Sequence, residues 1–152
     1  MADIIPEDEW GELMVDDTYL ERGEKIAQRC VSAIRALKRH PIRLLSVKEV
    51  LIETDEYAVD EILELLTLVH KQCAALTLFN QRTRSKTELL GARRVQQTIL
   101  ERLSDWNHLQ RLSISGILRY PEILYKWLYR CPNIQYLHMH CADRRRKIET
   151  TL

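Results

Sequence analysis

The chain has little glycine or proline and no long hydrophobic run. Its 152 residues include four Gly and four Pro, too few for the many tight turns of an all-β sandwich or barrel. No stretch approaches the roughly 20 apolar residues that span a bilayer, and the first residues lack the basic start and apolar core of a signal peptide. The sequence therefore predicts an intracellular protein, cytoplasmic or nuclear, whose four Cys are reduced thiols.

The motifs that carry catalysis or cofactor binding are also absent. There is no Gly-x-Ser-x-Gly, no His-Glu-x-x-His and no Cys-x-x-Cys, and the four glycines are isolated from one another. His138 and His140 lie close to Cys131 and Cys141 in the sequence. Zinc needs four converging ligands, whereas alternate residues of a strand are roughly 7 Å apart. We expect no enzyme activity, no metal and no cofactor.

Charge is distributed unevenly along the chain. Residues 1–70 carry 16 Asp and Glu against 8 Lys and Arg, whereas residues 71–152 carry 6 against 15. The formal net charge is nevertheless only +1. This uneven charge distribution influences how the chain associates with charged partners, but it does not identify a partner.

A short hydrophobic frame, apolar-x-x-apolar-x-apolar, occurs four times. It covers residues 47–52, 73–78, 109–114 and 134–139. Apolar residues at helical spacing fill the intervals 56–70, 88–104 and 118–130. Strands alternating with helices at this period predict parallel strands joined by helices.

The ends of the chain differ from this pattern. Thr18 and Glu21 fit a capping box, which predicts a helix that starts there and runs to about Lys38, ahead of Pro41. We therefore expect an acidic N-terminal arm over 1–16, one domain over 17–141 and a basic tail over 142–152.

The fourth frame resembles a known repeat family. The segment CPNIQYLHMHC over 131–141 resembles the cysteine-containing leucine-rich repeats of F-box substrate receptors, and 105–114 is similar, with Trp106 in place of the leading Cys. The family's Asn or Cys after the strand is replaced by Asp55, Gln81 and Ile117. The resemblance implies an α/β fold: a short leucine-rich-repeat solenoid of about four irregular repeats, with parallel strands, outer helices and an N-terminal capping helix.

The same family carries an F-box before its repeats. Residues 4–38 include IPEDEW and AQRC, which resemble degenerate pieces of that motif. The resemblance implies an alternative function as a substrate-receptor subunit of a cullin ubiquitin ligase that binds a Skp-type adaptor.

The alternating residues of the four strands should form one sheet face opposite the core. Repeat proteins commonly bind partners on such a face, so we expect a non-catalytic adaptor or scaffold subunit in a complex. The candidate partner-binding residues are Phe79, Arg111, Ser113, Tyr136, His138 and His140.

Two further partner classes rest on the C-terminal half. Its basic residues, including the run Arg144, Arg145, Arg146 and Lys147, could neutralise phosphates, which gives a second alternative function as a nucleic-acid-associated factor. No nucleic-acid module is visible, so protein partners are favoured. The end of the chain, with Glu149, Thr150 and Leu152, resembles a class I ligand of a PDZ domain.

Overall fold

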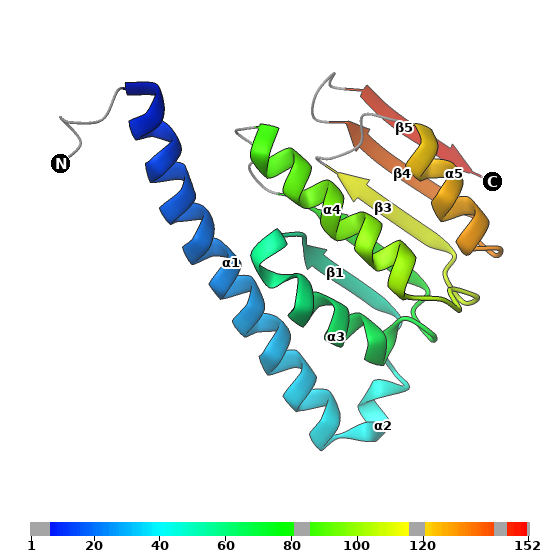
Figure 1. Cartoon of the computed structure of the whole chain (residues 1–152). Coiled ribbons are helices and arrows are strands. Elements are labelled where there is room, and N and C mark those ends of the chain that lie inside the picture. The colour runs from blue at the N-terminus through cyan, green and yellow to red at the C-terminus, as the bar shows by residue number, and fades with distance from the viewer. Residues whose placement is uncertain (1–6, 81–85, 116–120, 142–145, 152) are drawn as a thin grey trace.

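The chain folds as an α/β protein with one sheet. The computed structural model describes the backbone of residues 7–80, 86–115, 121–141 and 146–151, and the side chains of 20–80, 90–115, 123 and 125–140. The sheet has five strands in the order β1-β2-β3-β4-β5, of which the first four are parallel and β5 is antiparallel to β4. Figure 1 shows α3, α4 and α5 on one face of this sheet, with α1 beside α3.

The elements follow the order predicted from the sequence. The strands are β1 (Glu49–Glu53), β2 (Ala75–Phe79), β3 (Arg111–Ser115), β4 (Tyr136–Cys141) and β5 (Arg146–Thr151). The helices are α1 (Glu7–Arg39), α2 (Pro41–Leu44), the 3-10 turn η2 (Glu56–Ala58), α3 (Val59–Val69), α4 (Lys86–Arg102) and α5 (Pro121–Arg130). No helix in the described part of the chain is long and apolar enough to cross a membrane.

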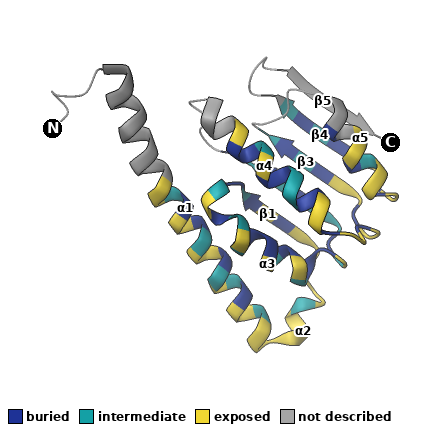
Figure 2. Cartoon of the chain, in the orientation of Figure 1, coloured by how far each residue is buried: buried dark blue, intermediate teal, exposed yellow. Residues whose placement is uncertain are grey.

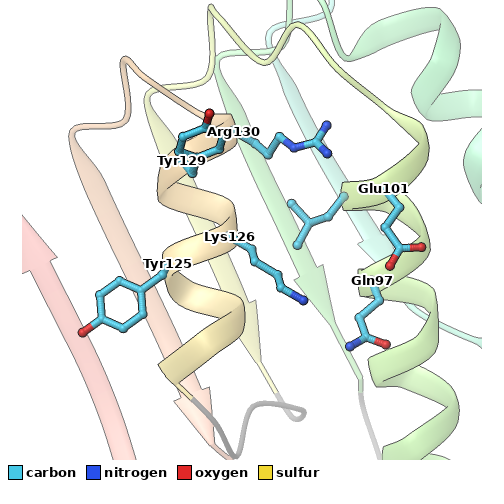
Figure 3. A pocket seen from close by; sticks show the side chains of 7 residues that line it. Gln97, Glu101, Tyr125, Lys126, Tyr129 and Arg130 are labelled. Atoms are coloured by element: carbon cyan, nitrogen blue, oxygen red, sulfur yellow. The ribbon is translucent and has the colours of Figure 1, made fainter.

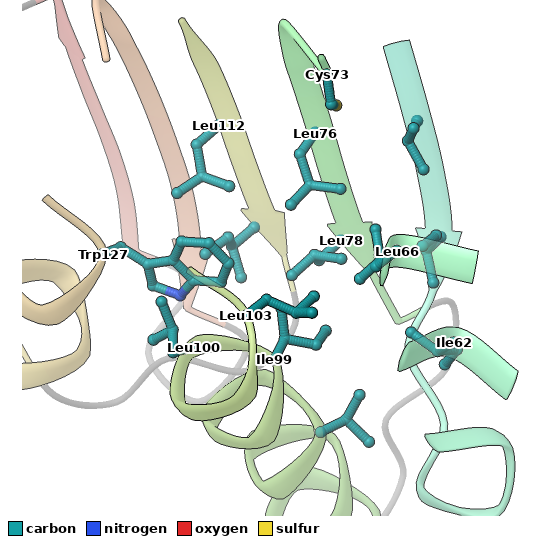
Figure 4. Packing of buried hydrophobic residues seen from close by; sticks show 14 of the residues in the cluster. Ile62, Leu66, Cys73, Leu76, Leu78, Ile99, Leu100, Leu103, Leu112 and Trp127 are labelled. Carbon is teal, nitrogen blue, oxygen red and sulfur yellow. The ribbon is translucent and has the colours of Figure 1, made fainter. Parts of the chain in front are cut away.

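The core lies between the sheet and the helix layer, and Figure 2 shows buried segments on the strands and on α3 and α4. The frame residues Leu76, Leu112 and Leu137 are in register on neighbouring strands and are at most 1% exposed. Burial alternates along each of the first three strands, so that every second side chain points away from the core. The buried side chains of the strands meet those of α3 and α4 and Trp127 of α5 (Figure 4). This confirms the predicted register.

One backbone connection recurs at the start of successive strands. The Lys48 carbonyl accepts hydrogen bonds from two consecutive amides, those of Ala74 at 2.7 Å and Ala75 at 2.9 Å. The Ala74 carbonyl accepts from Gln110 and Arg111 in the same way, and the Gln110 carbonyl accepts from Gln135 and Tyr136. Each strand therefore begins in the same geometry relative to the one before it.

A line of buried aromatic rings joins the helices behind the strands. Trp106 packs edge-on against His70, with ring centroids 5.2 Å apart, and against Trp127 at 5.7 Å. The two ring nitrogens of His70 lie 2.9 Å from the Leu66 carbonyl and 2.6 Å from the Ser104 carbonyl. The contacts connect the end of α3 to the loop after α4 and to α5.

The first helix begins earlier than predicted. It starts at Glu7 rather than at Thr18, so most of the expected arm over 1–16 is helical. Glu, Leu and Met after Pro6 favour a helix despite Gly11, and carboxylates in a first turn favour the N-terminal end of a helix. The capping box was therefore the wrong starting signal, whereas the end at Arg39 agrees with the prediction.

The described part of α1 packs closely against α3 and η2. Ile26, Cys30 and Ile34 are buried on that side. Gly23 permits the approach, because a Cβ there would lie 2.8 Å from both the Asp55 carboxylate and the Tyr57 Cβ. Any larger residue at this position would force the helix away from η2.

The C-terminal segment is a strand over most of its length rather than a tail. β5 pairs with β4 along its whole length, from Tyr136 opposite Thr151 to Cys141 opposite Arg146. A free β4 edge would leave a row of unpaired backbone groups, and Ile and Thr in the segment favour a strand. The many charged residues of 142–152 led to the prediction of a tail, which was wrong for the residues of β5.

Candidate functional site

The side of the sheet opposite the helix layer is the candidate site, and we call it the open face. One row across it runs through Glu49, Ala75, Arg111 and Tyr136, which pair in register on β1 to β4. The next row contains Leu51, Thr77, Ser113 and His138. Figure 1 shows the described helices on the other side of the sheet, so none of them lies over this face.

A shallow hollow of about 150 Å³ lies on the open face. Small residues of the middle strands, Ala75, Thr77 and Ser113, contribute to its lining. Glu49 on β1, Arg111 on β3 and Tyr136 on β4 also line it. Short side chains between two larger flanking groups give the hollow its shape.

Arg111 is held in place by its neighbour. Its guanidinium carbon lies 5.3 Å from the centroid of the Tyr136 ring, the geometry of a cation–π contact. Arg111 itself is exposed, whereas Tyr136 is half-buried. A planar cation that is partly oriented loses less freedom when it binds a carboxylate.

Acidic and basic residues of the open face lie on different strands. Glu49 and Glu53 lie on β1, whereas Arg111 lies on β3 with His138 and His140 on β4. This division follows the charge asymmetry of the sequence, because β1 belongs to the acidic half and β3 and β4 to the basic half.

The structure brings all six predicted partner-binding residues to the open face. Between β3 and β4, Arg111 pairs with Tyr136, Ser113 with His138, and Ser115 with His140. Between β1 and β2, Phe79 pairs with Glu53. Phe79 is only partly exposed. Its carbonyl accepts hydrogen bonds from the backbone amide of Thr54 at 2.8 Å and from its hydroxyl at 3.3 Å.

The C-terminal candidates are placed differently. Arg144, Arg145 and Leu152 lie outside the described residues. Arg146, Lys147, Glu149 and Thr150 belong to β5, where Glu149 pairs with His138 and Thr150 with Leu137. A PDZ domain would need this segment as a free strand, so its capture would compete with the β4 pairing.

A second polar cluster lies where β1 and β2 end. Arg22 of α1 approaches Glu53 at 3.6 Å and Asp55 at 4.0 Å, and it donates to Asn80 at 3.5 Å. Asp55 is 0% exposed and accepts a hydrogen bond from the Tyr57 amide at 2.9 Å, which caps η2. Burial raises the pKa of the Asp55 carboxyl, although the Tyr57 amide and Arg22 act in the opposite direction. This cluster fixes α1 to the end of the sheet.

Asp55→Asn should change how stability depends on pH. Because the pKa of Asp55 is raised above 3.8 in the folded chain, its contribution to the free energy of unfolding is fully present below that value and is lost as the pH rises through the raised pKa. Asn keeps an acceptor for the Tyr57 amide and carries no charge. The stability of Asp55→Asn relative to wild type should therefore rise as the pH increases through the raised pKa of Asp55, because only the wild type loses this contribution.

Urea unfolding at several pH values measures this difference. The matched control is Asp60→Asn on the exposed side of α3, which makes the same replacement outside the polar cluster. A difference between Asp55→Asn and wild type that does not change with pH would show that the burial of Asp55 does not affect its ionisation.

The described cysteines are unsuited to nucleophilic chemistry. Cys30, Cys73 and Cys131 are buried as free thiols. Burial raises the pKa of Cys73 to about 11 and that of Cys131 to about 12, and it also raises the pKa of Cys30. Among the residues whose positions are described, no three His, Cys, Asp or Glu side chains come together as metal ligands.

Sequence reasoning did not single out every residue of this site. Glu49 faces the hollow, and the polar cluster at Arg22 was not expected at all. Glu49 could have been selected by its register with Arg111. Arg22 could not, because its partners depend on how α1 packs.

The chain is thus an α/β protein whose helix layer lies on one side of a mostly parallel sheet. Comparison with family models, with curated proteins and with solved structures finds no match to this chain.

Proposed function

We propose that the chain is a non-catalytic protein-interaction module that acts as an adaptor or scaffold through its open face. In this proposal it is a short, irregular leucine-rich-repeat solenoid in which α1 covers the first repeat. Sequential parallel strand order and helices on one face support this architecture. The recurring connection from one strand start to the next also supports it.

The observation that carries the proposal is the hollow beside the Arg111–Tyr136 pair. Its volume of about 150 Å³ is below the roughly 300–1,000 Å³ of typical small-molecule sites. It suits a single side chain of a protein partner. Tyr and Arg are among the residues that contribute most to protein interfaces.

The charge division of the face specifies the kind of partner. A carboxylate of the partner would pair with Arg111, and a basic group would meet Glu49 across the hollow. Neighbouring strands lie about 4.8 Å apart, so the two charged positions, on β1 and β3, are about 10 Å apart at the backbone. We therefore expect a partner segment with both signs of charge at about this spacing.

Affinity capture with matched variants tests the proposal. Arg111→Glu reverses the charge beside the hollow, and Ser113→Arg fills it. Arg102→Glu is the control, because Arg102 is exposed on α4 in the helix layer. The wild type and Arg102→Glu should recover the same discrete set of proteins, and Arg111→Glu and Ser113→Arg should lose it. A set that the wild type and all three variants recover equally would contradict binding on the open face.

The same capture tests the runner-up function. The F-box-like residues 4–38 lie mostly in α1, on which a ubiquitin-ligase receptor would depend for its adaptor. Recovery of a Skp-type adaptor and a cullin by the wild type and also by Arg111→Glu would favour the substrate-receptor function. Their absence from a specific wild-type set would favour the scaffold.

A further inference from the structure

A groove lies between α4 and α5, on the opposite side of the sheet from the open face. Its volume is about 510 Å³, and its lining residues are Gln97, Leu100, Glu101, Tyr125, Lys126, Tyr129 and Arg130. Figure 3 shows Lys126 and Arg130 extending from α5 toward α4. The groove is therefore a feature of the helix layer, separate from the proposed partner site.

The groove combines a buried apolar residue with exposed aromatic rings. Leu100 is 3% exposed, whereas Tyr125 and Tyr129 are 67% and 87% exposed. Tyr129 is the most exposed of the large apolar and aromatic side chains that the structure describes. Rings of this kind supply much of the binding energy when a partner covers them.

The helices that form the groove are basic, whereas their neighbour is acidic. α4 carries four Lys or Arg against two Glu, and α5 carries two against one. α3 carries three acidic residues and no basic one. In the groove itself, Lys126 and Arg130 outnumber Glu101, so an acidic occupant is favoured.

We propose that this groove binds the acidic N-terminal segment of a second copy of the chain. Residues 1–17 contain seven Asp and Glu and no Lys or Arg. Helix α1 begins at Glu7, and its sequence places Trp10, Leu13 and Met14 at the three- and four-residue steps of one helix face. An acidic helix with such anchors matches the helix-in-groove mode of recognition.

The occupant comes from a second copy, because α1 and the groove lie on different parts of the same chain's helix layer. The described part of α1 packs against α3, and α4 lies between α3 and α5 (Figure 1). Two copies can exchange their N-terminal segments reciprocally, which gives a closed two-fold dimer. This inference does not depend on the partner proposed for the open face.

Light scattering of the full-length chain tests the dimer. At low ionic strength and about 100 µM, a concentration sufficient for a micromolar complex, the expected mass is twice 18.0 kDa. Salt and the double variant Lys126→Glu/Arg130→Glu should each weaken association at least about tenfold. The control Arg35→Glu/Lys71→Glu, at exposed positions outside the groove, should dimerise as the wild type does.

A charge exchange between two variants identifies the occupant. Glu9→Lys/Glu12→Lys reverses charge in the N-terminal segment and should also be monomeric. Mixed with Lys126→Glu/Arg130→Glu, it should form a heterodimer, because both reciprocal contacts then pair opposite charges. Circular dichroism checks that each variant retains its helices. A monomeric wild type, a dimer insensitive to the groove reversal, or a mixture that stays monomeric would each overturn the proposal.

Discussion

Replacing Trp106 by alanine should cost about 3–5 kcal/mol of unfolding free energy. Trp106 is 0% exposed and contacts His70 and Trp127 through its ring. Its indole N–H donates to the Leu103 carbonyl at 3.3 Å. Alanine removes all three contacts and leaves a cavity where the end of α3 and the loop after α4 meet α5. Typical domains have only about 5–15 kcal/mol of stability, so the variant should be near the limit of folding.

Denaturant unfolding with two comparison variants measures this effect. Trp106→Phe keeps part of the ring contact and should lose less than Trp106→Ala. His108→Ala, two residues away and exposed, should stay within about 0.5 kcal/mol of wild type. A small loss for Trp106→Ala would mean that the aromatic line does not hold the helices together.

Leu112→Ala should cost about 2–5 kcal/mol, whereas Ser113→Ala should stay within about 0.5 kcal/mol of wild type. The two residues are neighbours on β3 with opposite orientations. Leu112 is 0% exposed and pairs with Leu76 and Leu137 in the core layer, whereas Ser113 is half-exposed on the open face.

Equilibrium unfolding of both variants in the same denaturant provides the comparison. Because side chains alternate across a strand, a shift of one residue would exchange the two effects. Equal losses for Leu112→Ala and Ser113→Ala would contradict the register.

The strand layer could be predicted because its signal is local and repeated. Each frame places two buried residues two positions apart, as at Leu112 and Ile114, and a strand can bury them only on the same face. The alignment of four such frames then fixed the register between strands, including the pairing of Arg111 with Tyr136. The six candidate residues on the open face follow from that alternation.

The remaining features depend on contacts between distant segments. Gln96 is 0% exposed, and within the described part of the chain both its amide atoms lack hydrogen-bond partners. Polarity alone would place such a residue on the surface. Gly23 resembles any glycine in sequence, and its role depends on how closely α1 approaches Asp55. β5 was missed because its strand structure depends on pairing with β4, which its own charged sequence does not indicate.

Chemical labelling of the open face in the presence of a captured partner tests the central claim most directly. The buried thiols with raised pKa, Cys30, Cys73 and Cys131, should react slowly with a maleimide at neutral pH. In a Cys141→Ser background, Ser113→Cys therefore reports on the open face and Arg102→Cys on the helix layer. We predict that the partner slows the labelling of Ser113→Cys and leaves that of Arg102→Cys unchanged. Labelling of Ser113→Cys at the same rate with and without the bound partner would contradict the assignment of the open face as the interaction surface.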